Sequence, residues 1–210
     1  MHISETIKEE NYIKNKFGKT SVELLDEFGL LKDAILVHCC YIEESDVDLI
    51  ARRRAHVVVC PTSNIRLGNR LPPLNNFIDK NLNISIATDG LATNTSNNIF
   101  YECLTLKKNI PNINDKELIN MITVNPAKAL SLPIGEIKKG NKADLAVFNS
   151  NIIKSNFNNL LSLLKSNNCN DVIINGNIIL KNYRVLNLNR NKIEKNFKEV
   201  QSLIKNNLTN

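Results

Sequence analysis

Short apolar runs that each end in polar residues recur along the first 90 residues of the chain. Residues 1–3 precede Ser4 and Glu5, residues 34–37 precede His38, residues 57–59 precede Cys60, and residues 84–87 precede Thr88 and Asp89. Stretches typical of helices separate these runs, and strands that alternate with helices predict a parallel sheet of βα units. The carboxyl ends of parallel strands meet at one edge, so we expect the polar residues to face a shared site.

Four such strands are half of what a closed (β/α)8 barrel contains. A barrel of that kind typically takes about 250 residues, whereas this chain has 210, and its character changes after Pro133. We therefore predict an α/β fold in which residues 1–133 form half of a barrel.

The remainder of the chain predicts a different kind of structure. Residues 134–186 are rich in turn residues and in short apolar runs, and Asn175-Gly176 between two of these runs is a strong hairpin signal. This segment is expected to be a partial small β-domain. Residues 187–210 carry Ile193, Phe197, Val200 and Ile204 at helical spacing, which predicts an amphipathic C-terminal helix.

Composition and charge indicate which binding partners and which cellular compartment to expect. The net charge is +6, but the lysines are scattered among acids and the only compact basic run is residues 52–54, so we expect no nucleic-acid partner. No apolar run approaches the roughly 18 residues of a membrane span, and no membrane association is expected. The five cysteines include no Cys-x-x-Cys pair, which favours free thiols and a cytoplasmic location.

Several strand-end residues suit a metal-dependent reaction. His2 lies in the first predicted strand and Glu5 just after it, while His38 and Asp89 follow the second and the fourth. Taken singly, each has an ordinary interpretation: a chance surface pair, a buried histidine, or a helix cap. Together they are harder to explain in that way, because neutral imidazole and carboxylate groups are the ligands of a catalytic zinc.

The order and spacing of these residues resemble a known family. The motifs are His2-Ile3-Ser4-Glu5-Thr6, His38-Cys39, Cys60-Pro61-Thr62-Ser63-Asn64 with Arg66-Leu67-Gly68-Asn69, and Thr88-Asp89-Gly90. They resemble the C-terminal half of the amidohydrolase superfamily, in the branch of S-adenosylhomocysteine, methylthioadenosine and aminofutalosine deaminases. The resemblance runs from about residue 2 to about residue 182 and implies that the strands are barrel strands five to eight.

The resemblance also implies a role for each site residue. His2 would bind the metal after strand five, and Glu5 would carry a proton to the substrate ring. His38 would polarise the attacking water, and Asp89 would touch the metal and accept the proton of the water. The substrate-binding residues would be Ser63, Asn64 and Arg66, in the loop after strand seven, and Thr93.

The activity implied in this way is metal-dependent deamination. The substrate would be an adenosine-derived, purine nucleoside-like amine, attacked by metal-bound hydroxide with release of ammonia. The metal implied is zinc, with iron as the alternative divalent ion. Other reactions of the superfamily, such as guanine deamination or hydrolytic dechlorination, remain open alternatives.

The chain also departs from the family pattern. The His-x-His pair of strand one has no counterpart, and the remaining histidine, His56, stands at the start of a predicted strand, where a structural role is expected. His2 and Asp89 alone do not complete a metal site, so we expect the chain to be inactive by itself. The alternatives to an enzyme are a non-catalytic remnant or a subunit that needs an N-terminal partner half. The expected protein partner is either that half or a second copy of the chain. Cys39, next to His38, is expected to be a buried structural thiol.

Overall fold

The structure is a computed structural model that describes residues 1–110, 112–149, 161, 164 and 168–208. These residues form two compact units. The first contains Met1–Asn141, and the second contains Lys142–Asn149 and Asn168–Asn210.

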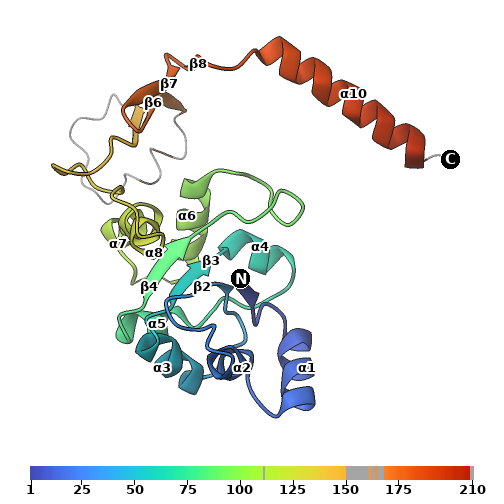
Figure 1. Ribbon diagram of the computed structural model, residues 1–210, viewed down its shortest axis with the longest axis vertical. Helices are drawn as coiled ribbons and strands as arrows, with labels where there is room; N and C mark the ends of the chain where they lie inside the picture. The colour runs from blue at the N-terminus through green and yellow to red at the C-terminus, as the bar shows by residue number, and fades with distance from the viewer. Residues whose placement is uncertain (111, 150–160, 162–163, 165–167, 209–210) are drawn as a thin grey trace. The chain divides into compact units, whose positions relative to one another are not determined.

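The first unit is built on a four-stranded parallel sheet in the order β1-β2-β3-β4 (Figure 1). The strands are β1 (His2–Ile3), β2 (Ile35–His38), β3 (His56–Val59) and β4 (Asn83–Ile86). Each strand pairs with its neighbour in the chain, and β1 and β4 form the edges of the sheet that the described residues make. The register aligns His2, Val37, Val58 and Ser85 in one row across the sheet. The four predicted strands are therefore present, and their carboxyl ends lie at one edge.

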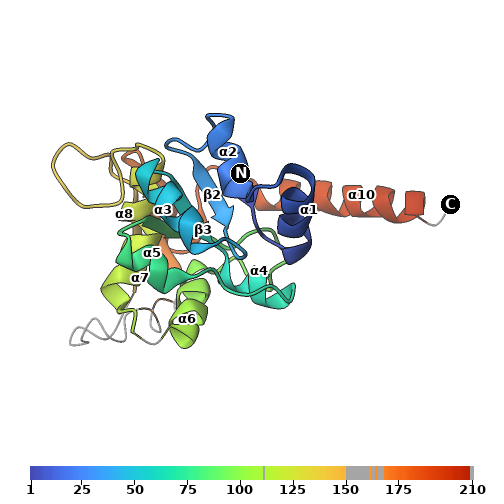
Figure 2. The same cartoon turned by 90° about the horizontal axis from the view of Figure 1, so that it is seen from below.

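Helices connect and cover the strands. They are α1 (Ile7–Phe17), α2 (Ser21–Glu27), α3 (Glu44–Arg52), α4 (Pro61–Arg66), α5 (Leu74–Asp79), α6 (Ile99–Asn109), α7 (Asp115–Ile122) and α8 (Val124–Ala129). Local sequence explains several ends: Gly18 takes a left-handed conformation (φ 67°) after α1, and Thr20 and Glu23 form a capping box at α2. Helix α3 contacts both α2 and α5, and Figure 2 shows α3 beside α5.

The core lies between the sheet and these helices. The strands contribute alternate residues, and the helices contribute apolar residues from several turns: Leu36, Val57, Val59, Ile84 and Ile86 from the strands, and Val22, Val47, Ile50, Phe77, Leu106 and Leu118 from the helices. Burying a side chain of this size stabilises the fold by about 1.5–3 kcal/mol. This core fixes the position of the strand ends.

Gly135 provides a test of the packing after α8. A Cβ at this position would lie 2.6 Å from the backbone oxygen of Thr123, and the residue has φ +88°. We expect Gly135→Ala to lower the free energy of unfolding by about 2–4 kcal/mol, because overpacking and a left-handed backbone both cost stability. Gly140→Ala is the control, since Gly140 has φ +97° but a Cβ there would meet no heavy atom within 4 Å. Urea denaturation should show a clearly smaller loss for Gly140→Ala, and equal losses would contradict the packing argument.

The second unit contains an antiparallel sheet in the order β5-β6-β7-β8. The strands are β5 (Leu145–Phe148), β6 (Cys169–Ile174), β7 (Asn177–Lys181) and β8 (Arg184–Val185). Asn175 and Gly176 have φ values of 49° and 79° and join β6 to β7, which is the backbone that an Asn-Gly hairpin turn requires. The predicted hairpin is present, whereas β8 was not predicted.

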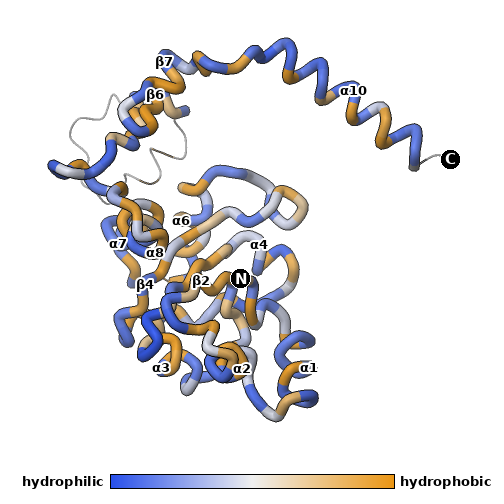
Figure 3. The backbone as a smooth tube through the Cα atoms, viewed as in Figure 1, coloured by the Kyte–Doolittle hydropathy of each residue, from blue (hydrophilic) through white to orange (hydrophobic). Residues whose placement is uncertain are grey.

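The C-terminal helix α10 (Arg190–Leu208) follows this sheet. Ile193, Phe197, Val200 and Ile204 recur along it and are exposed. Figure 3 shows hydrophobic and hydrophilic segments alternating along α10. Throughout the described residues, the structure contains no helix that combines the length and the apolar character needed to cross a bilayer.

Candidate active site

The backbone is strained at the carboxyl ends of three strands. Ser4 after β1, His38 and Cys39 at the end of β2, and Asp89 after β4 have φ values of 47°, 76°, 51° and 60°. Residues other than glycine rarely adopt this left-handed conformation, which costs about 1–3 kcal/mol at each position and is concentrated at functional sites. The strain coincides with the strand ends at which the sequence predicted a site.

Two carboxylates of α1 hold the turn that carries Glu5. The backbone N–H of Ser4 donates to Glu9 Oε1 at 2.8 Å, and the backbone N–H of Glu5 donates to Glu9 Oε2 at 3.0 Å. The Ser4 hydroxyl donates to Glu10 Oε2 at 2.9 Å, and Glu10 is buried. These bonds fix the backbone of Glu5, so its side chain projects from a rigid turn.

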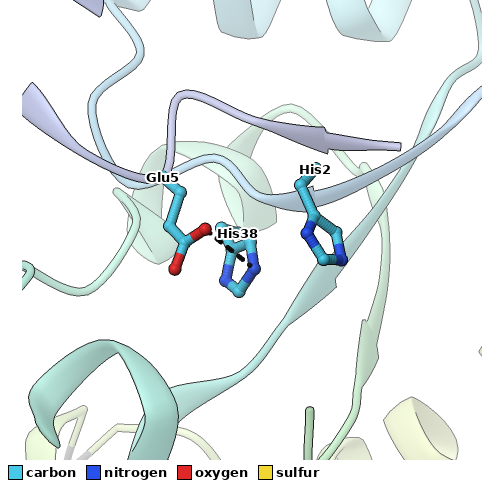
Figure 4. A group of neighbouring side chains, drawn as sticks. All are labelled: His2, Glu5 and His38. Atoms are coloured by element: carbon cyan, nitrogen blue, oxygen red, sulfur yellow. Dashed lines mark ion pairs between the residues drawn. The ribbon is translucent and has the colours of Figure 1, made fainter. Parts of the chain in front are cut away.

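His2, Glu5 and His38 form one group of side chains (Figure 4). Their candidate ligand atoms all lie within 4.8 Å of one another. Glu5 Oε2 lies 3.6 Å from His38 Nε2, and the rings of His2 and His38 meet edge to face with centroids 4.9 Å apart. His38 is buried, Glu5 is half-buried and His2 is exposed on the edge strand.

This group fits a divalent metal in the type and number of its donors. Catalytic zinc commonly takes three protein ligands drawn from imidazole and carboxylate groups, with an open position for water. His2, Glu5 and His38 offer two imidazoles and one carboxylate at the ends of adjacent strands. The fit therefore lies in the chemistry of the donors and in their placement on neighbouring strands.

Asp89 is held by two hydroxyl groups. Ser63 Oγ donates to Asp89 Oδ2 at 2.7 Å, and Thr93 Oγ1 donates to the same oxygen at 2.8 Å. Burial raises the pKa of Asp89, but these bonds, a bond from the Gly90 N–H and the nearby His38 outweigh it, and the pKa is lowered from its ordinary value. Among the described residues, the group of close ligand atoms consists of His2, Glu5 and His38 and does not include Asp89.

Ser63, Asn64 and Arg66 lie on helix α4, so their expected placement in a loop was wrong. Proline at the first position of α4 supplies the fixed φ that starts a helix. Ser63 contacts Asp89, and Asn64 Oδ1 lies 2.9 Å from His38 Nδ1. Arg66 is exposed at the last turn, without a hydrogen bond or ion pair to other described residues.

Sequence analysis missed two buried polar residues that support this edge of the sheet. Asn94 Nδ2 donates to Glu102 Oε1 at 2.9 Å and also to the backbone oxygen of Thr88. Glu102 Oε2 accepts from the backbone N–H of Thr62, at the start of α4, at 2.9 Å. Asn94 and Glu102 therefore tie α6 to α4 and to the turn before Asp89. Their sequence positions resemble an ordinary loop and an ordinary helix, and no local pattern indicated burial.

His56 lies away from these residues, at the first position of β3, as predicted. Burial and the positive charge of Lys128 lower the pKa of His56. Asn83 Nδ2 lies 3.0 Å from His56 Nδ1. These contacts agree with a structural role.

The cysteines lead to a chemical test. Cys39, Cys40, Cys60 and Cys103 are buried free thiols, and Cys169 is half-buried. Burial raises the pKa of Cys40, Cys60 and Cys103 to about 12 and that of Cys39 further still. Because the thiolate is the reactive form, we expect only Cys169 to react quickly with a disulfide reagent in the folded chain. Guanidinium should expose all five thiols, and rapid native labelling of Cys39 would contradict its assignment as a structural thiol.

Comparison with known families and sequences gives consistent results. The model of the Amidohydrolase family matches residues 1–179. The chain is 33% identical to the 5-methylthioadenosine/S-adenosylhomocysteine deaminase of Pyrococcus furiosus, over 95% of this chain and 51% of that protein. It is 30% identical to the 5'-deoxyadenosine deaminase of Methanosarcina acetivorans, over 92% of this chain and 48% of that protein. The chain thus spans about half the length of these relatives.

Solved structures show the same fold. A zinc-bound adenosine deaminase from Xanthomonas campestris superposes with a TM-score of 0.88 at 24% identity, over 98% of this chain and 50% of that one. The zinc complex of atrazine chlorohydrolase from Arthrobacter aurescens superposes with a TM-score of 0.82 at 20% identity, over 94% and 47% of the two chains. At these identities the superpositions establish the fold alone.

Proposed function

The chain belongs to the amidohydrolase family, whose fold is of the α/β TIM-barrel type, and we propose that it supplies half of a metal-dependent deaminase site. The observation that carries the proposal is the group of His2, Glu5 and His38 at the ends of adjacent parallel strands, with Asp89 beyond the fourth strand. Relatives named as deaminases of adenosine-derived compounds support a small purine nucleoside-like substrate.

The proposed domains follow the two kinds of sheet. Residues 1–133 would be barrel strands five to eight, residues 134–186 a partial β-domain, and residues 187–210 the terminal helix. Parallel strands β1 to β4 and antiparallel strands β5 to β8 support this division. The antiparallel strands follow the parallel strands in the chain. This order supports the proposal that the chain corresponds to the C-terminal half of the family.

The metal would be held in part by His2 and Asp89, and zinc is the proposed ion. The chemistry that a bound divalent metal supplies is a water molecule whose pKa falls to about 7. The imidazole of His2 and the carboxylate of Asp89 are donor types that suit zinc, and zinc in solved structures of the same fold supports a divalent ion. Further ligands would come from strands outside this chain, because its three histidines include no His-x-His pair.

The proposed reaction gives each carboxylate a separate proton. Asp89 accepts a proton from the attacking water, and Glu5 delivers a proton to the substrate ring nitrogen as the carbon–oxygen bond forms. The carbon–nitrogen bond then breaks as Asp89 passes its proton to the exocyclic amine, which leaves as ammonia, and the proton of the added hydroxyl returns to Glu5 as the carbonyl forms. His38 polarises the water, while Ser63 and Thr93 orient Asp89. General acid–base steps of this kind contribute about 10²–10⁴-fold each.

The remaining wall of the site would come from the other half of a barrel. The described sheet has β1 and β4 as its edges, and His2 is exposed on β1. We therefore propose that the chain is inactive alone and needs the strands that complete the barrel.

The test is reconstitution. The chain would be produced with the half of the Pyrococcus furiosus deaminase that it does not cover, both as two chains and as one fused polypeptide, with zinc added. We expect ammonia release from methylthioadenosine, S-adenosylhomocysteine or 5'-deoxyadenosine by this reconstituted enzyme, and none from the 210-residue chain. A folded, zinc-loaded complex that releases ammonia from none of them would refute the proposal. Turnover of guanine or a chlorotriazine alone would support guanine deamination or hydrolytic dechlorination in place of the proposed reaction.

A further inference from the structure

His38 and Asn64 form a buried pair of side chains. Asn64 is fully buried, His38 is 1% exposed, and Asn64 Oδ1 lies 2.9 Å from His38 Nδ1. The other ring nitrogen, Nε2, faces Glu5 Oε2 at 3.6 Å. The two nitrogens of one imidazole therefore meet different groups, and only Nε2 faces the group that contains His2 and Glu5.

The contact with Asn64 determines where the ring carries its hydrogen. An amide oxygen is an acceptor only, so a hydrogen bond at 2.9 Å requires a hydrogen on His38 Nδ1. A neutral imidazole has one N–H, so Nε2 is then the nitrogen with a free lone pair. That is the form in which His38 can accept a hydrogen bond from water at Nε2.

His56 shows the opposite arrangement and serves as an internal comparison. Asn83 Nδ2 donates to the backbone oxygen of Asn125 at 2.9 Å, which fixes the orientation of the Asn83 amide. The same nitrogen lies 3.0 Å from His56 Nδ1, so Nδ1 of His56 accepts and Nε2 carries the hydrogen. With the two amides oriented in this way, the contacts require opposite tautomers of His38 and His56, each against an asparagine.

The Asn64 amide is not explained by packing alone. Asn64 Nδ2 is buried and has no hydrogen-bond partner among the described residues. A buried polar group without a partner destabilises the folded state. Leucine would fill a similar volume without an unpartnered Nδ2, so packing alone does not account for an amide whose Oδ1 meets His38.

We propose that Asn64 is a positioning residue that keeps the hydrogen of His38 on Nδ1 and so presents Nε2 to the reacting water. The catalytic meaning rests on the proposed deaminase function, whereas the tautomer itself does not. The proposal assigns Asn64 to His38 instead of to the substrate.

The first test is ¹⁵N NMR of the 210-residue chain labelled at its three histidines. Signals would be assigned with His2→Gln, His38→Gln and His56→Gln, and recorded at pH of about 9, well above the ordinary imidazole pKa of about 6.5. We expect a hydrogen on Nδ1 of His38 and on Nε2 of His56. Finding the hydrogen of His38 on Nε2 would overturn the proposal.

Two substitutions of Asn64 distinguish a change in the His38 tautomer from a change in the fold. In Asn64→Leu the tautomer ratio of His38 should shift about tenfold toward Nε2–H, because the hydrogen bond that favours Nδ1–H is lost. Asn64→Asp keeps an acceptor and should retain the Nδ1–H form. His56 should be unchanged in both variants, which shows that the fold is intact. An unchanged ratio for His38 in folded Asn64→Leu would overturn the proposal.

The reconstituted enzyme gives the second readout. We expect Asn64→Leu to lower kcat by about 10–100-fold with little change in KM, as for other groups that orient a reacting side chain, and Asn64→Asp to recover part of the loss. A raised KM with unchanged kcat would instead make Asn64 a substrate contact. If the reconstituted enzyme deaminates nothing, the proposed function fails, and the NMR result still decides the tautomer.

Discussion

Asp89→Asn is expected to lower kcat of the reconstituted enzyme by about 10⁴-fold, at the upper end of the range for removal of a general base. The substitution removes the negative charge that is proposed to accept a proton from water, and it weakens one proposed metal ligand. Ser63 and Thr93 can still donate to the amide oxygen that replaces Asp89 Oδ2, so the local hydrogen bonds and the fold should persist. The loss should therefore appear in catalysis and metal content, with little change in the melting temperature.

The measurement is ammonia release at saturating substrate, together with zinc per protein by elemental analysis. Asp26→Asn is the control, because Asp26 binds the guanidinium of Arg53 through both carboxylate oxygens, away from the strand ends. It should retain full activity. An Asp89→Asn enzyme within tenfold of the parent kcat would exclude Asp89 as the proton acceptor.

The strands and the edge that carries the site could be predicted because their signals are local. Each strand is a short apolar run followed by a polar residue, and the hydrophobic core places those runs side by side. His38 ends β2, and Asp89 follows β4 by three residues. The chemistry-bearing residue types at strand ends were therefore visible before the structure.

The side-chain contacts that support the candidate site residues could not be predicted, because they join segments that are distant in the sequence. Helix α4 was interpreted as a loop, since its Pro-Thr-Ser-Asn start contains residues that favour turns as readily as helix starts. The pairing of Asn64 with His38, 26 residues away in the chain, follows from the tertiary structure. The buried Asn94–Glu102 bond likewise links a loop to a helix in a way that no sequence periodicity indicates.

Glu5 has two interpretations that a single substitution distinguishes. The proposed role is transfer of a proton to the substrate ring, yet Glu5 also lies within the group whose ligand atoms could hold a metal. Glutamine preserves the shape and one acceptor oxygen of Glu5, while the backbone remains fixed by Glu9. Any large effect of Glu5→Gln therefore reports on the charge and the transferable proton.

We expect Glu5→Gln to lower kcat by about 10²–10³-fold while zinc content and KM stay close to those of the parent enzyme. Glu136→Gln, at an exposed position outside the site, should change neither activity nor stability. Loss of zinc in Glu5→Gln would identify Glu5 as a ligand and contradict the proton-transfer role. Because Asp89→Asn should lose both metal and turnover, whereas Glu5→Gln should lose turnover alone, the two variants together assign the two carboxylates to different tasks.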